Sequence, residues 1–218
     1  MFVRVSLVAI ALCVLSASVG AQDREQGWEL STFVVYQDPQ KITFNGGSIA
    51  DLDEDIGLSV SATYRLNSRL EFVFGLDWNS VNYDVNIVSS SLPQRSFSGR
   101  GDLESFTPNI NANFNLFEGP VTPYVTAGAG WSFIDTNIPD APPQFACWWD
   151  PWYGEVCNTY QSTRTTDELT YRLGVGLRWD ISEDYVLRLG YAKQWLDLGQ
   201  ATSTPDFDQL KLGVTLKY

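Results

Sequence analysis

"IGLSVSATYRL", residues 56–66, is the stretch that decides the fold, because apolar and polar residues alternate along it without a break. One set of positions is apolar: Ile56, Leu58, Val60, Ala62, Tyr64 and Leu66. The positions between them are Gly57, Ser59, Ser61, Thr63 and Arg65. A period of two residues is typical of a β-strand, and here it predicts a strand with one apolar and one polar face.

The same alternation recurs along the chain. It is regular in residues 70–78, 106–116, 169–180 and 210–218, and less regular in residues 27–37, 121–134 and 185–197. Beyond the N-terminal region, no apolar run reaches the roughly 20 residues that a transmembrane helix needs. The sequence therefore predicts an all-β protein with eight strands.

The connections separate a membrane barrel from a soluble β-sandwich, which would show the same alternation. Short connections cover residues 67–68, 117–120 and 182–184, and long ones cover residues 38–55, 83–101, 135–167 and 199–205. An even number of strands joined by alternating short and long connections is typical of outer-membrane barrels. We therefore predict an eight-stranded antiparallel transmembrane up-and-down β-barrel with short periplasmic turns and long extracellular loops.

Aromatic residues near the strand ends support this choice. On the apolar faces they include Trp28, Tyr36, Trp78, Trp131, Phe133, Trp179, Tyr185, Tyr191, Trp195 and Tyr218. Aromatic belts of this kind anchor membrane proteins at the two interfaces. Ordinary core aromatics would occur in the middle of strands as readily as at their ends.

The N-terminus indicates export. "MFVRVSLVAIALCVLSASVGAQ" has one early positive charge at Arg4, a short apolar run, and small residues ending at Ala21. This pattern is typical of a secretory signal peptide, whereas a membrane anchor would need a longer apolar run. We predict a signal peptide over residues 1–21 and a single barrel domain over residues 22–218. Cys13 is then removed with the signal peptide.

The exported chain, the eight alternating strands and the closing "LKLGVTLKY" (210–218) resemble small outer-membrane barrels of the OmpA/OmpX/OmpW type. "TPYVTAGAGWSF" (122–133) is similar to a strand common in these proteins. The resemblance implies the outer membrane of a Gram-negative bacterium, contact with its lipid and lipopolysaccharide, and a monomer. It also implies that Tyr218 is the terminal signal through which the barrel-assembly machinery inserts the barrel.

The longest connection contains the unusual segment "CWWDPWYGEVC" (147–157). In an exported chain, the two cysteines that remain, Cys147 and Cys157, predict one disulfide bond. Between them lie Trp148, Trp149, Trp152 and Tyr153. Two interpretations stay open: the rings fold over the barrel mouth as a cap, or they contact an external protein, glycan or lipopolysaccharide, since exposed aromatic residues often anchor such contacts.

The predicted inward face carries charges of both signs. The acidic residues are Glu29, Glu71, Asp77 and Asp180, and the basic residues are Arg65, Arg69, Arg172, Arg178, Arg188, Lys211 and Lys217. An eight-stranded barrel has an interior just wide enough for side chains to fill, and buried charges must be paired. We therefore expect ion pairs that plug the lumen. The alternative is a passive channel for small solutes, which rings of one sign would favour.

Composition argues against several other functions. The chain has a net charge of −12, which disfavours nucleic acid as a partner. It contains no histidine, the usual general base of enzymatic outer-membrane barrels, so we predict no enzyme, no catalytic residues and no cofactor. "DLDED" (51–55) offers carboxylates that could hold Ca²⁺, but it does not match a calcium-binding loop, and we interpret it as a solvated acidic segment without a metal site. The predicted role is envelope integrity or surface interaction through the extracellular loops.

Overall fold

The computed structural model describes residues 26–218 except 44–46, 89–95, 140–143, 161 and 198–203. The predicted signal peptide lies outside the described residues, so the division at Ala21 stays a prediction. The described residues include no helix that could cross a membrane.

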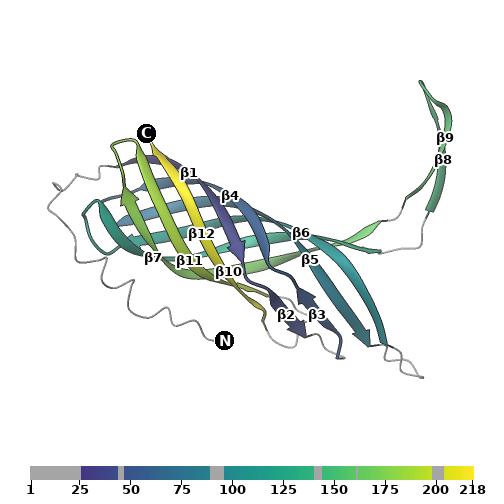
Figure 1. Ribbon diagram of the computed structural model, residues 1–218. Coiled ribbons are helices and arrows are strands. Elements are labelled where there is room, and N and C mark those ends of the chain that lie inside the picture. The colour runs from purple at the N-terminus through teal and green to yellow at the C-terminus, as the bar shows by residue number, and fades with distance from the viewer. Residues whose placement is uncertain (1–25, 44–46, 89–95, 140–143, 161, 198–203) are drawn as a thin grey trace.

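The architecture is a closed antiparallel β-barrel (Figure 1). Its strands are β1 (Gly27–Gln37), β4 (Asp55–Arg65), β5 (Leu70–Val88), β6 (Ser96–Asn115), β7 (Val121–Pro139), β10 (Thr163–Asp180), β11 (Tyr185–Leu196) and β12 (Asp206–Lys217). Each of these strands pairs with the next along the chain, and β1 pairs with β12 to close the barrel. The predicted eight-stranded fold is confirmed.

Two hairpins complete the structure. The first, β2 (Gln40–Thr43) and β3 (Ile49–Leu52), joins the barrel sheet through pairing of β3 with β5. The second, β8 (Gln144–Asp150) and β9 (Gly154–Tyr160), forms a separate two-stranded sheet. Figure 1 shows this second hairpin standing away from the barrel, at the end opposite the C-terminus.

Alternation along each strand sorts side chains between the inside and the outside of the barrel. On β4, Ser61 is 5% exposed and faces inward, whereas Leu58 is 57% exposed and faces outward. The buried face is therefore polar and the exposed face is apolar, the reverse of a soluble sandwich. A chain with this arrangement is stable only when hydrocarbon surrounds the barrel, because water outside would leave the apolar face solvated and lose its stabilisation.

The predicted long loops are partly wrong, because much of residues 83–101 and 135–167 is strand. Every second side chain of β5 faces inward, from Glu71 through Asp77 to Val81 and Tyr83. The pairing of β5 with β6 shows no change of register along this stretch. Beyond Trp78, however, the inward residues become apolar and the outward residues polar. This switch marks the point where the barrel leaves the bilayer and water replaces hydrocarbon on its outer face.

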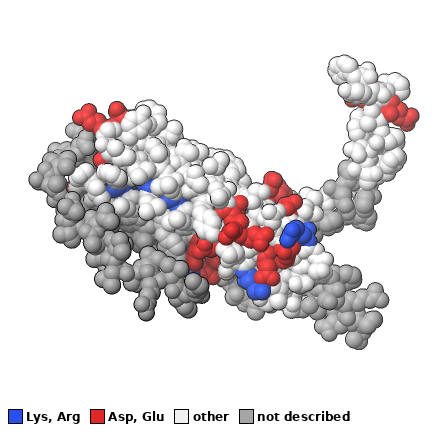
Figure 2. Space-filling view, in the orientation of Figure 1, with Lys and Arg blue, Asp and Glu red and all other residues white. Residues whose placement is uncertain are grey.

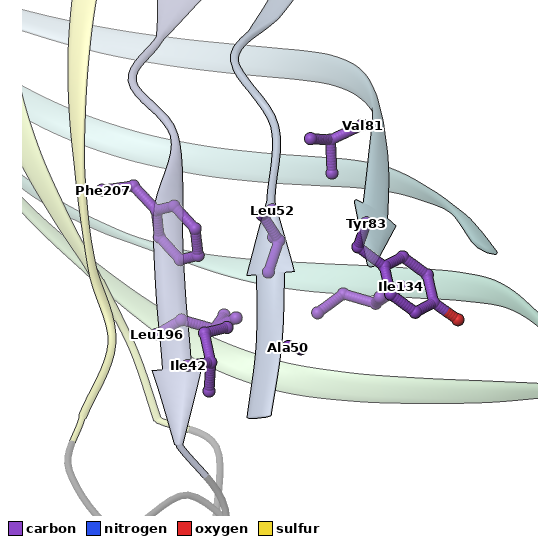
Figure 3. Packing of buried hydrophobic residues seen from close by; sticks show 8 residues of the cluster. All are labelled: Ile42, Ala50, Leu52, Val81, Tyr83, Ile134, Leu196 and Phe207. Carbon is purple, nitrogen blue, oxygen red and sulfur yellow. The ribbon is translucent and has the colours of Figure 1, made fainter. Parts of the chain in front are cut away.

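The extended part of the barrel consequently has an apolar core of its own (Figure 3). The buried residues of this cluster are Ile42, Ala50, Leu52, Val81, Tyr83, Ile134, Leu196 and Phe207. They come from β2, β3, β5, β7, β11 and β12, at the end of the barrel away from the short turns. We call this region the mouth, and it lies on the side of the long connections.

Candidate functional site

The lumen is filled near the short turns by a network of buried charges, the periplasmic network. Arg178, which is fully buried, donates hydrogen bonds to Glu29 at 2.7 and 2.9 Å and to Glu71 at 2.7 Å. It also donates to Asp180 at 2.9 Å. Arg188 donates to the same two glutamates, at 2.6 Å to Glu29 and 2.9 Å to Glu71. These two guanidinium groups thus tie together strands on opposite walls of the barrel.

Further side chains complete the periplasmic network. Arg65 pairs with Glu29 at 3.1 Å, and Lys217 pairs with Asp180 at 2.9 Å. Asn115 donates an amide hydrogen bond to Glu71 at 2.9 Å. Burial of charge is costly without partners, and here every charged group has at least one. The network therefore fills the lumen here with charges that each have a partner of opposite sign.

A second cluster, the central network, lies farther from the short turns. Asp77 accepts hydrogen bonds from Arg172 at 2.5 Å and from Lys211 at 3.0 Å. Arg172 also donates to Gln194 at 2.6 Å. Between the two networks the ring of Tyr124 lies over Gly176, where an added Cβ would come within 2.3 Å of the ring. Aromatic bulk occupies the lumen there because glycine leaves space on the adjacent strand.

The predicted inward charges lie in these two networks, with one exception. The prediction that Arg69 faces inward is wrong. Its side chain is 55% exposed and pairs with Glu118 at 3.0 Å, outside the lumen. The reason is local, because Arg69 belongs to the turn that precedes β5 rather than to the strand. The carboxamide of Asn67 accepts hydrogen bonds from the backbone N–H groups of Arg69 and Leu70, which shapes this turn.

The space left in the lumen is small. Between the networks the cavity is about 70 Å³ and is lined by groups such as Asp77, Tyr124 and Lys211. A conducting pore needs a continuous water path, and the buried ion pairs interrupt one. The mixed signs of charge agree with the predicted plug rather than with a channel.

We expect the purified protein to show no discrete conductance steps in planar lipid bilayers. The reason is that ions would have to displace fully buried Arg178 and Glu71 from each other in order to pass. Single-channel recording at both voltage signs, with protein-free detergent as the control, measures this directly. Discrete, reproducible steps from the folded wild-type protein would show that the lumen conducts.

The acidic segment 51–55 does not gather its carboxylates around one point. Asp51 pairs with Lys41 at 3.0 Å, and Asp55 accepts a hydrogen bond from the backbone N–H of Ser80 at 3.1 Å. Among the described residues, Cys147, Glu155 and Cys157 form the one group with the spacing of metal ligands, and both of its cysteines are bonded to each other.

The β8–β9 hairpin carries the predicted contact residues. Cys147 and Cys157 face each other across its two strands and form a disulfide bond. At the tip, the carboxylate of Asp150 accepts hydrogen bonds from the backbone N–H groups of Trp152 at 2.8 Å and Tyr153 at 3.0 Å. Gly154 follows with a φ of +77°, a backbone conformation that glycine adopts without strain. The bridge and the turn together restrain the backbone of the tip.

The aromatic rings of this hairpin are exposed. The exposed fractions are 49% for Trp148, 77% for Trp149, 86% for Trp152 and 84% for Tyr153. Figure 1 shows the hairpin projecting from the mouth rather than lying across it. The rings are thus exposed in this structure, and a contact role for them stays a prediction.

Comparison with known proteins agrees with this architecture. The chain is similar to Neisserial surface protein A, with 15% identity, a TM-score of 0.54, and coverage of 88% of this chain and 97% of that one. It is also similar to Ail, the attachment invasion locus protein of Yersinia pestis, solved in complex with the heparin analogue sucrose octasulfate. That match has 15% identity, a TM-score of 0.50, and coverage of 89% and 100%. At this identity the likeness establishes the fold alone. No curated protein sequence is significantly similar to this chain.

The sequence itself matches a family model over most of its length. The match covers residues 7–218, and the family is described as "Outer membrane protein beta-barrel domain". An apolar outer face, a polar interior and closure of β1 onto β12 are the features of a barrel in the outer membrane. The chain therefore belongs to the outer membrane protein beta-barrel domain family and resides in the outer membrane of a Gram-negative bacterium.

Proposed function

We propose that this protein is a non-catalytic barrel that serves surface interaction, with the β8–β9 hairpin as the contact element. The observation that carries the proposal is the exposure of Trp149, Trp152 and Tyr153 on a disulfide-bonded hairpin outside a sealed barrel. Aromatic side chains of this type dominate the binding energy of many interfaces. Water-exposed rings contribute more binding free energy than buried ones, because binding removes their apolar area from water.

The preorganised tip strengthens this proposal. The disulfide and the turn at Asp150 hold the backbone before any partner arrives. Association then orders fewer groups, and the entropic cost of binding is lower. Lysine and arginine are absent from residues 144–160, whereas Asp150 and Glu155 are present. The tip therefore suits a neutral or cationic partner, an external protein or glycan, better than a polyanion such as the heparin analogue bound to Ail.

The rest of the molecule supports a role in the envelope. The apolar outer face contacts membrane lipid, and we propose that lipopolysaccharide covers its outer-leaflet part. We also propose that barrel-assembly machinery recognises Tyr218, which is 78% exposed in the folded barrel. Histidine is absent from the chain, which supports a function without acid–base catalysis. We propose a monomer, because the barrel closes on itself and leaves no unpaired strand edge in the bilayer.

Replacing Trp149, Trp152 and Tyr153 together with alanine should reduce binding to the external partner by at least about thirtyfold, because truncating even one hot-spot residue costs about 2 kcal/mol or more. The measurement is attachment of cells that display the protein to arrays of neutral glycans and extracellular proteins. The heat-modifiable band of the variant on an electrophoresis gel should match the wild type, since none of the three residues belongs to the barrel.

A matched control is the pair Asn158→Ala and Thr159→Ala, which changes exposed polar residues of the same hairpin. This control should retain binding. Serine in place of both cysteines should keep the barrel folded but loosen the tip and weaken binding. Equal attachment by the wild type, the alanine variant and cells without the protein would contradict the proposed function.

A further inference from the structure

The mouth of the barrel contains an apolar cavity of about 240 Å³. Its wall includes Ile42 and Leu52 from the first hairpin, Val81 and Ile134 from the barrel wall, and Phe207 from β12. Figure 3 shows these side chains converging on one space from different strands. The wall of the cavity is apolar because the inward face of the strands turns apolar beyond the aromatic belt.

The size of this cavity is unusual for a packed interior. Protein cores are as dense as organic crystals and contain few voids larger than a water molecule. An engineered apolar cavity of about 150 Å³ in another protein stays dry and binds benzene or xenon. A larger cavity with a wall of similar chemistry has room for one small ring or a short alkyl chain.

The floor of the cavity is polar and closed. Gln37 lies at this level and accepts hydrogen bonds from Gln209 at 3.1 Å and from Asn79 at 3.4 Å. The central network follows beneath it, with Asp77 held by Arg172 and Lys211. An apolar molecule in the mouth would have to break these polar contacts to move farther. The site is therefore a pocket that opens outward and not the start of a passage.

Carboxylates predominate on the outside of the mouth. Carboxylates on the outward face of the extended strands are Asp51, Asp84, Asp102, Glu104, Asp135, Asp167, Asp206 and Asp208, and they outnumber the cations Lys41, Arg100, Arg164 and Lys193 there. Figure 2 shows acidic side chains gathered on this part of the molecule. The hydrogen bonds from Arg100 lower the pKa of Asp84, so this carboxylate is charged over a wide range of pH. A neutral molecule is favoured over a fatty acid or another organic anion.

We propose that the mouth cavity binds one small, uncharged, apolar molecule from the exterior, of the size of an alkyl-substituted benzene. Tyr83 and the hydroxyl groups of Ser105 and Thr136 line part of the wall, which leaves a place for at most a weak polar group on the ligand. Burial raises the pKa of Tyr83, so its phenol stays neutral and places no second charge in the cavity. This binding site is independent of the β8–β9 hairpin.

Nuclear magnetic resonance of the protein in lipid nanodiscs tests the proposal, with isotope-labelled isoleucine, leucine and valine methyl groups. Toluene should shift the methyl signals of Ile42, Leu52 and Ile134 in a saturable manner. Benzoate, which has the same ring and a negative charge, should bind at least about tenfold more weakly. The lipid-facing methyl groups of Leu173 and Val175 should change only in proportion to the toluene dissolved in the bilayer.

Two matched variants identify the cavity as the site. Ala50→Leu adds bulk to the cavity wall and should abolish the saturable shifts, whereas Ala112→Leu adds the same bulk on the lipid-facing side of β6 and should not. Both variants are first checked for the heat-modifiable band. If the Ala50 variant does not fold, the comparison of toluene with benzoate on the wild type decides alone. Proportional shifts at all methyl groups, or equal binding of both probes, would overturn the proposal. The hairpin variants should bind toluene normally, which separates this test from that of the proposed function.

Discussion

Replacing Glu71 with leucine should lower the free energy of unfolding by about 3–5 kcal/mol, the cost of breaking a buried ion pair on one side only. Glu71 is fully buried and accepts hydrogen bonds from Arg178, Arg188 and Asn115. Its removal leaves two buried guanidinium groups with fewer carboxylates to neutralise them. Unfolding by urea in lipid vesicles, followed by the fraction of heat-modifiable protein, measures the change.

The charge balance of the periplasmic network explains why the loss of Glu71 is costly. The cations are Arg65, Arg178, Arg188 and Lys217, and the anions are Glu29, Glu71 and Asp180. The network already has one more cation than anion, so losing Glu71 widens the excess. Glu29 and Asp180, which also pair with Arg178, cannot compensate for the lost carboxylate, because they already neutralise Arg65 and Lys217.

A double variant separates charge from packing. Replacing both Glu71 and Arg188 with leucine returns the network to its original excess of one cation, so this protein should be more stable than the Glu71 variant alone. Glu71→Gln keeps the shape of the side chain and a hydrogen-bond acceptor, so its stability should lie between those of the Glu71→Leu variant and the double variant. A loss of less than about 1 kcal/mol for Glu71→Leu would mean that water reaches the network, since exposed ion pairs contribute only that much.

Replacing Val175 with arginine should destabilise the protein by about 2–4 kcal/mol, because a charge at the bilayer midplane loses its hydration. The outward face of β10 places Val175 midway between Trp179 near the short turns and Tyr171 toward the mouth. These two aromatic residues mark the interfaces, and Val175 itself is 55% exposed to lipid. The same urea titration in vesicles measures the effect.

The matched control is Leu169→Arg, on the same face of β10 but beyond Tyr171. Near the interface the cost of an arginine falls to about 0–1 kcal/mol, so this variant should be close to the wild type. Leu173→Arg should have an intermediate effect on stability. Leu173 lies opposite Lys193 on β11, and Lys193 pairs with Asp206 and Asp208, so an arginine at position 173 would have charged neighbours. Equal effects at positions 169 and 175 would show that the bilayer is placed wrongly along the barrel.

Alternation alone was enough to predict the strands that cross the bilayer. Ile56 to Leu66 and Leu70 to Trp78 have the same pattern because one side of each strand meets lipid and the other meets a polar interior. The inward charges followed from the same period, and all but Arg69 lie in the lumen. That exception arose at a strand end, where the period carries no information about where a turn stops.

Strand length could not be read in the same way. Along β5 the apolar positions change from Leu76 and Trp78 to Val81 and Tyr83, which looks like the end of a strand when only polarity is followed. The backbone continues without a shift of register, and the solvent outside changes instead. The mouth cavity was missed for this reason, although a reversal of the alternation within an unbroken strand is a signal that could have found it.

Local order of residues thus sufficed for the membrane barrel and the cysteine pair, because each depends on neighbours in the chain, whereas the export signal stays a prediction. Which charges pair depended on the closed sheet: Glu29, Glu71 and Arg178 lie on different strands and meet only across the lumen. The same holds for the mouth, where Ile42, Ile134 and Phe207 surround one cavity. The direction of the β8–β9 hairpin, away from the mouth, was also decided in three dimensions, since sequence period says nothing about where a hairpin points.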